Sequence, residues 1–231
     1  MVQKLQVWRN EYKYWISYPD SIYLKEDLNK LLIPDRYSLG GGYKVRSLYF
    51  DSINNIDYMQ KMSGVEFRKK IRLRSYGEDT DSVKLEMKQK RGKYQKKSSL
   101  ILNRQDAVHV QNGNYEVLLN QEDDTALEIY SLLKLGCYRP VTLVEYDRMA
   151  YIYPEFSTRL TIDQNVRCSC TELDLFQKNV RWNPAINRYA ILEVKFNQHL
   201  LKMISNVLGK YDLVNTSISK YGYSRDMELI L

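Results

Sequence analysis

Apolar and charged residues alternate strictly along several short segments of the chain. Residues 70–74 are Lys-Ile-Arg-Leu-Arg, and residues 83–88 are Val-Lys-Leu-Glu-Met-Lys. A period of two is typical of a β-strand with one apolar and one polar face. The turn-rich segment 77–82 joins the two stretches, so the pattern predicts a β-hairpin. Residues 192–197 show the same alternation near the end of the chain.

The rest of the chain is predicted to supply more strands and scattered helices. A helical spacing of apolar residues covers 20–32 and ends before Pro34, because the residue preceding proline disfavours helix. Other predicted helices cover residues 54–62, 104–110, 125–135 and 199–208. Other predicted strands cover residues 5–17, 43–51, 94–102, 141–153, 157–163 and 190–197. No repeat or linker is visible over residues 1–231, so this order favours a single antiparallel α+β domain over a doubly wound one.

Composition narrows the class of protein. With 231 residues, 44% of them hydrophobic and 27% charged, the chain is expected to be globular. It contains neither a membrane-length apolar run nor a signal-peptide pattern, so the cytoplasm is the expected location. Three cysteines and two histidines make a zinc ribbon or a Ser-His-Asp triad improbable. The chemistry is therefore expected to use carboxylates, lysines and arginines.

The positive charge is concentrated in one part of the chain. The net charge is +7, and residues 66–104 alone contain thirteen Lys or Arg against five acids. A solvated sheet face explains alternation in a single strand. Arginine at every second position brings like charges together, which favours an anion between them. On this basis, replacing Arg72 and Arg74 should relieve repulsion in the empty protein, and Glu86 is expected to pair with Lys84 and Lys88.

Several blocks resemble the VTC branch of the triphosphate tunnel superfamily, the polyphosphate polymerase domain. The opening block is Arg9-x-Glu11-x-Lys13, in which Arg9 stands where the hydrolase branch of the superfamily has a glutamate. The later blocks follow in the family's order and cover residues 43–51, 70–76, 146–151, 159–163, 192–195 and 219–221. The resemblance implies a closed eight-stranded antiparallel β-tunnel with a charged lumen and helices packed outside. The charged strand faces would then line the lumen.

The resemblance also implies residue roles. The residues with an implied catalytic role are Lys13, Arg72, Arg74 and Lys220. The residues implied to bind phosphate are Arg46, Lys84, Arg148, Arg159, Lys195 and Ser219. Glu193, with Glu11, is implied to hold one Mn²⁺ or Mg²⁺, which prefer oxygen ligands. The family places a further base where this chain has Ser217, which weakens one wall of the tunnel.

The family implies a phosphotransferase that moves the γ-phosphoryl group of ATP or another nucleoside triphosphate onto polyphosphate. A hydrolase of the same fold, acting on tripolyphosphate or a nucleoside triphosphate, is the nearest alternative. Arg9 disfavours it, because activation of water usually needs more carboxylates. A third alternative is a binding module for polyphosphate, inositol phosphates or nucleic acid. Nucleic acid is disfavoured, since the bases alternate with aliphatic more than with aromatic residues.

Overall fold

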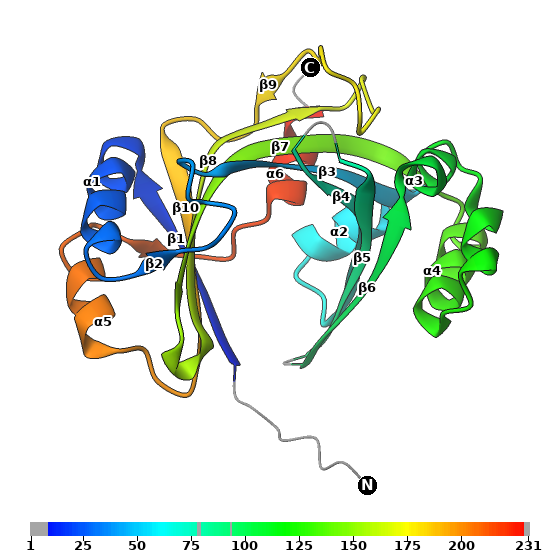
Figure 1. The fold of residues 1–231 in the computed structure, drawn as a ribbon. Helices are drawn as coiled ribbons and strands as arrows, with labels where there is room; N and C mark the ends of the chain where they lie inside the picture. Colours follow the sequence, from blue (N-terminus) through cyan, green and yellow to red (C-terminus); the bar gives the residue numbers. More distant parts are fainter. Residues whose placement is uncertain (1–8, 78–79, 93, 229–231) are drawn as a thin grey trace, which may run out of the picture. The chain divides into compact units, whose positions relative to one another are not determined.

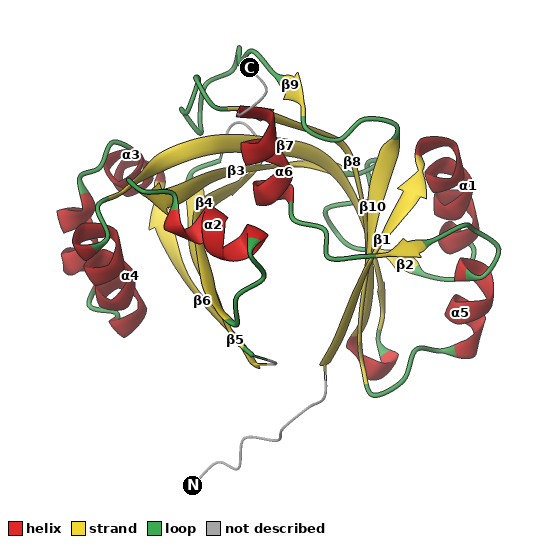
Figure 2. Cartoon of the chain, turned by 180° about the vertical axis from the view of Figure 1, so that it is seen from behind, coloured by secondary structure: helices red, strands yellow, loops and turns green. Residues whose placement is uncertain are grey.

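The computed structural model describes residues 9–77, 80–92 and 94–228 and has an α+β fold with a large antiparallel sheet (Figures 1 and 2). The chain divides into two compact units, each built from three separate segments. Unit 1 comprises Met1–Tyr43, Tyr146–Val166 and Ile186–Ile218. Unit 2 comprises Lys44–Glu145, Arg167–Ala185 and Ser219–Leu231. The α+β class expected from the sequence is confirmed.

Unit 1 is built on antiparallel strands in the order β11 (Val214–Asn215), β1 (Arg9–Ser17), β10 (Tyr189–Asn197), β8 (Thr158–Ser169) and β7 (Tyr138–Tyr153). The short strand β2 (Ile33–Pro34) pairs with β7, and the one-turn helix η2 (Glu155–Ser157) connects β7 to β8. Helices α1 (Tyr18–Asn29) and α5 (Lys202–Leu208) lie side by side in this unit (Figure 1). Their apolar side chains pack with Leu160, Leu192 and Val194 of the strands.

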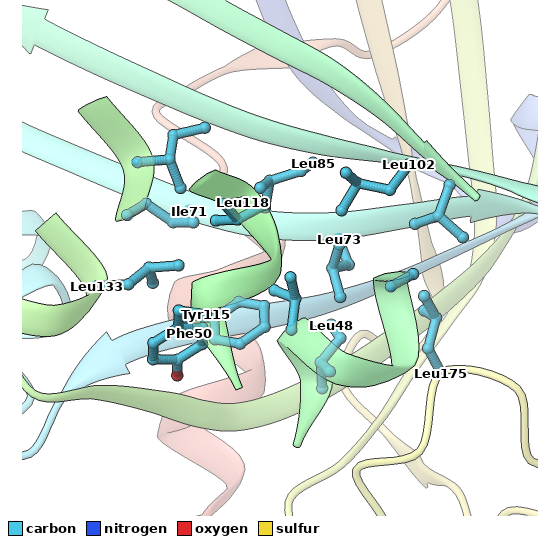
Figure 3. Close-up of a cluster of buried hydrophobic side chains, with 14 of the residues drawn as sticks. Leu48, Phe50, Ile71, Leu73, Leu85, Leu102, Tyr115, Leu118, Leu133 and Leu175 are labelled. Atoms are coloured by element: carbon cyan, nitrogen blue, oxygen red, sulfur yellow. The ribbon is translucent and has the colours of Figure 1, made fainter. Parts of the chain in front are cut away.

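Unit 2 continues from β7 through β3 (Tyr43–Ser52), β4 (Phe67–Tyr76), β5 (Ser82–Arg91) and β6 (Tyr94–Asn103). Strand β9 (Asn183–Pro184) pairs with β8. The helices of this unit are α2 (Ile56–Met62), α3 (Arg104–Gln111), the 3-10 helix η1 (Tyr115–Gln121), α4 (Asp124–Leu135) and α6 (Lys220–Glu228). Residues of α3, η1 and α4 cover one face of the strands (Figure 3).

The hairpin predicted from alternation is confirmed as β4–β5. Leu73 pairs with Leu85, and Ile71 pairs with Met87, so these apolar residues share one face. They are fully buried in a cluster with Leu102 and Leu133 (Figure 3). Arg72 pairs with Glu86 and therefore points to the other face, because successive side chains alternate across a strand. Burial of one face sets this register, since a one-residue slip would expose every apolar side chain.

The first helix differs from its prediction at its end. Ser17 caps it by accepting a hydrogen bond from the Asp20 amide at 3.1 Å, and Pro19 occupies the first turn. The helix ends at Asn29 rather than at residue 32, and the residues before Pro34 form a turn and then β2. Pairing with β7 therefore makes Ile33 extended, while Leu32 is buried from a non-helical position.

Two helices of unit 2 were absent from the sequence predictions, namely η1 and α6. Helix α6 contains Gly222 and has no clear apolar period, so nothing in its pattern indicates helix. Tertiary contacts hold it instead: Tyr58 donates to Asp226 at 2.7 Å, and Arg225 donates to Asn55 at 2.9 Å. Among the described residues, no helix is both long and apolar enough to cross a membrane.

Candidate functional site

A buried carboxylate organises the charged face of unit 2. Glu86 is 3% exposed and accepts from Arg72 Nε at 2.8 Å. Lys97 Nζ lies 2.5 Å from the same carboxyl group, and Arg74 Nη1 lies 3.6 Å away. Burial alone would raise the pKa of Glu86, but Arg72, Arg74 and Lys97 outweigh burial and hold the pKa well below its usual range. Glu86 is therefore a carboxylate shared by three cations.

The expected partners of Glu86 were wrong. Lys84 and Lys88 share its face, yet they lie two positions away along the same strand. The residue directly opposite on β4 is Arg72, and the diagonal neighbour on β6 is Lys97, because Lys88 pairs with Lys97. Directly opposed residues approach more closely than residues i and i+2 of one strand. Lys84 instead places its ammonium over the Tyr76 ring at 5.5 Å.

Aromatic residues connect this face to the start of α6. Arg72 Nη1 donates to Tyr49 Oη at 2.9 Å, and the Tyr49 ring stacks on Tyr221 with centroids 5.2 Å apart. Burial would raise the pKa of Tyr49, but Arg72, Arg74 and Lys220 lower it. Lys220 is thus close enough to lower the pKa of the same phenol as Arg72 and Arg74 do.

Ser219 is fixed at the beginning of α6. Its Oγ accepts from the Gly222 amide at 3.1 Å and from Lys70 Nζ at 2.6 Å. Lys70 belongs to the same alternating row as Arg72 and Arg74. Unit 2 therefore brings together Lys70, Arg72, Arg74, Ser219 and Lys220 around Glu86 and Tyr49.

Arg46 lies apart from Arg72 and Arg74, beside Arg167, which binds the same Glu145 carboxylate. Ser47 and Tyr49 pair with Arg74 and Arg72, so Arg46 points to the opposite face of β3. There its guanidinium is 2% exposed, lies 2.6 Å from Glu145 and donates to the carbonyls of residues 175 and 177 at 3.2 and 2.7 Å. This geometry supports a structural ion pair inside unit 2. The phosphate contact implied for Arg46 by the family resemblance has no support from this position.

Unit 1 carries a second charged face, centred on Glu193. Lys13 and Lys195 place their ammonium groups 3.8 and 3.1 Å from Glu193, and Lys13 is also 3.3 Å from Glu11. Burial would raise the pKa of Glu193, but Lys13, Lys195, a hydrogen bond with Glu11 and Arg148 hold it well below its usual range. In β1 and β10, these side chains point away from Tyr14, Leu192 and Val194, which belong to the apolar cluster of unit 1.

Two further bases of unit 1 are oriented by aspartates. Arg148 donates to Asp163 through Nε at 2.6 Å and through Nη2 at 2.8 Å, a two-pronged contact. Arg159 donates to Asp35 at 2.9 Å and to the Tyr43 hydroxyl at 3.4 Å. Lys195 pairs with Arg159 across β10 and β8, so both belong to the face of Glu193. Ser217 is exposed.

The carboxylates of unit 1 fit a divalent cation. Glu11 and Glu193 both lie beside Lys13, with carboxylate oxygens 3.3 and 3.8 Å from its ammonium group. Ionised carboxylate oxygens suit Mg²⁺ or Mn²⁺ better than zinc. The described part of the chain contains no cluster of three or more metal-ligating side chains, so phosphate oxygens or water would have to complete the coordination. The Arg9 side chain lies outside the described residues.

Sequence reasoning missed the acidic and aromatic partners of the cations. The missed residues are Asp35, Tyr49, Asp163 and Lys97, together with the shared role of Glu86. Asp163 alone had a signal, because it ends the alternating block 159–163. Tyr49 and Lys97 are identified by strand register, and Asp35 by its contact with Arg159 from the segment after β2.

Comparisons with known proteins agree with this fold. The model of the VTC domain family matches residues 8–227. A candidate adenylate cyclase from Vibrio parahaemolyticus has a TM-score of 0.51 at 11% identity, covering 94% of this chain and 97% of that one. A candidate adenylate cyclase from Bacillus halodurans has a TM-score of 0.49 at 13% identity, with 87% and 85% coverage. No curated protein sequence matches.

Proposed function

Because the chain belongs to the VTC domain family, we propose that it is a polyphosphate polymerase-type phosphotransferase. It would move the γ-phosphoryl group of ATP or another nucleoside triphosphate onto a polyphosphate chain. The proposal includes closure of the sheet into a tunnel whose lumen is lined by the charged faces of both units. It also includes a cytoplasmic location.

The observation that carries this proposal is the clustering of cations around single carboxylates. In unit 2, Arg72, Arg74 and Lys97 all contact the Glu86 carboxylate. A phosphate chain carries about one negative charge per unit, and arginine offers two-pronged contacts to phosphate oxygens. The excess of cations over carboxylates is what such a chain needs for neutralisation.

Phosphoryl transfer depends mainly on positioning and on neutralising the oxygens of a loose transition state. Arg72 is oriented from two sides, by Glu86 and by the Tyr49 hydroxyl, so its guanidinium is held in place. Lys70 and Ser219 hold the start of α6, which carries Lys220. In the proposed reaction these residues bind and align the phosphates before transfer.

A divalent metal would be held by Glu193 and Glu11. When bound, it would neutralise phosphate oxygens and orient the transferred group. Lys13 and Lys195 keep Glu193 ionised and so ready to accept such a cation. Arg148, fixed by Asp163, adds a further cation beside Glu193.

Two other activities fit the family resemblance: hydrolysis of triphosphates and binding without chemistry. The three activities are distinguished by incubating the full chain with ATP and Mn²⁺ and then resolving polyphosphate and free phosphate on a gel. Transferase activity gives metal-dependent long polymer, and Glu193→Gln abolishes it. Free phosphate without polymer would identify a hydrolase. Absence of both, with tripolyphosphate still bound, would identify a binding module.

A further inference from the structure

A pocket of about 510 Å³ lies at the end of the β4–β6 strands and is lined by residues of both strand faces. Its floor is a row of three residues in register, since Phe67 pairs with Arg91 and Arg91 pairs with Tyr94. Phe67 shares the strand face of Ile71, which is buried under the helices of unit 2. The row extends beyond the apolar cluster, where the strand face is no longer covered.

The row combines exposed rings with a cation. Phe67 is 56% exposed and Tyr94 is 66% exposed, although both are large aromatic residues. The Arg91 guanidinium lies over the Phe67 ring at 5.2 Å. Exposed aromatic faces beside a guanidinium form a platform on which a planar ring can stack and an anion can bind.

Among the described residues, the lysines of the next row contact carboxylates, whereas Arg91 does not. Lys69 lies 3.2 Å from Asp57, while Gln89 and Lys96 donate to Glu128 of α4 at 3.1 and 3.0 Å. These contacts neutralise both lysines. No ion pair to a carboxylate is found for Arg91 within residues 9–77, 80–92 and 94–228. Arg91 is therefore a cation that this pocket offers to a ligand, and Arg68 and Lys90 line the same pocket.

We propose that this pocket binds a nucleotide, with the base stacked on Tyr94 and Phe67 and a phosphate on Arg91. The Gln60 side chain from α2 lines the same pocket and offers an amide to the edge of a base. The volume lies within the range of small-molecule sites. Phe67, Arg91 and Tyr94 lie on the strand face opposite Arg72 and Glu86, so this nucleotide is a different molecule from the proposed transferase substrate.

The test uses the full chain with saturating tripolyphosphate, so that the proposed catalytic face is occupied by a ligand without a base. Titration with AMP in a calorimeter is expected to show one site. Tyr94→Ala should weaken AMP binding about tenfold, because stacking is lost, whereas Tyr94→Phe should retain it. The matched control is Tyr23→Ala, since Tyr23 is 60% exposed on a helix of unit 1. Its AMP affinity should equal that of the wild type.

Four results would overturn the proposal. Absence of AMP binding, or an unchanged affinity in Tyr94→Ala, would show that the row does not bind a base. Equal affinity for ribose 5-phosphate and AMP would show that only phosphate is recognised. Binding of an oligoadenylate without AMP would identify single-stranded nucleic acid as the partner. Circular dichroism on each variant confirms that the fold is retained before affinity is compared.

Discussion

The protonation of each buried acid in this protein depends on how many cations surround its carboxyl group. Glu86 is surrounded by three cations and has a strongly lowered pKa. Asp57 is fully buried with Lys69 as the nearest cation, and burial outweighs that contact and raises the pKa of Asp57 to about 6. A buried carboxyl group in two settings thus has opposite effects on stability as pH changes.

The raised pKa of Asp57 should make the free energy of unfolding depend on pH. Its folded pKa of about 6 exceeds the ordinary value of 3.8, so the folded state binds more protons between these pH values. The stability contributed by the neutral carboxyl is therefore present below pH 3.8 and is lost as pH rises through 6. Compared with Asp57→Asn, the wild type should lose about 2–3 kcal/mol between pH 4 and 7. Urea unfolding of both proteins measures this difference, and a constant difference would contradict the assignment.

We expect Glu193→Gln to reduce turnover without reducing metal-free tripolyphosphate binding. The amide keeps the size of the side chain but removes the charge that would hold a metal. Turnover of ATP with Mn²⁺ should fall about 100-fold or more, equivalent to about 3 kcal/mol in the barrier. Metal-free tripolyphosphate affinity, measured by calorimetry, should persist. Full activity in this variant would assign Glu193 a purely structural ion pair with Lys13 and Lys195.

At the scale of elements, the alternation of apolar and charged residues predicted the strands. The register of strand pairing determines which charged side chains contact one another. The period of two in 70–74 and 83–88 fixed which side chains share a face, and the β4–β5 hairpin confirms that arrangement. Which cation meets Glu86 depends on how strands align, and the sequence does not contain that alignment explicitly. Arg46 was grouped with Arg72 for the same reason, although the pairing of β3 with β4 places it on the other face.

The Glu86 cluster changes the expected behaviour of Arg72→Ala/Arg74→Ala. Removing both arginines was expected to relieve repulsion, but it leaves the buried Glu86 carboxylate with Lys97 alone. Breaking a buried ion pair by deleting one partner costs about 3–5 kcal/mol. We therefore expect a clear fall in melting temperature, and Glu86→Gln added to the double variant should restore most of it. Thermal unfolding of the three proteins is the measurement; an unchanged melting temperature in the double variant would show that Glu86 does not need the arginines.

The restored triple variant also tests binding. It lacks two charge-assisted hydrogen bonds, each worth roughly 1.5–3 kcal/mol, so tripolyphosphate affinity should drop at least about 100-fold. Glu86→Gln alone is the matched control and should bind at least as tightly as the wild type, because it removes a competing carboxylate. Calorimetry on folded protein gives both affinities. Equal affinity in the triple variant and its control would mean that β4 does not contact the ligand.

At the scale of the whole molecule, each unit repeats one design. A charged strand face is backed by an apolar face, and a buried glutamate holds its cations: Glu193 in unit 1 and Glu86 in unit 2. The sequence located the bases of both faces, because the family blocks cover nearly the whole chain. It included Asp163 at the end of the block 159–163, but the roles of Asp163 and Asp35 in orienting Arg148 and Arg159 depend on tertiary contacts.

A shared tunnel requires both faces to act on one ligand. Under the proposed function, tripolyphosphate should bind with a stoichiometry of one and should be weakened by changes in either unit. Lys195→Ala in unit 1 leaves Glu193 paired with Lys13, so the fold should tolerate it. Combined with Arg72→Ala of unit 2, its effect on affinity should depart from additivity by at least about 0.5 kcal/mol, because residues that contact one ligand are coupled. Two independent sites, or strictly additive losses measured by calorimetry, would show that the faces bind phosphate separately and that no common tunnel exists.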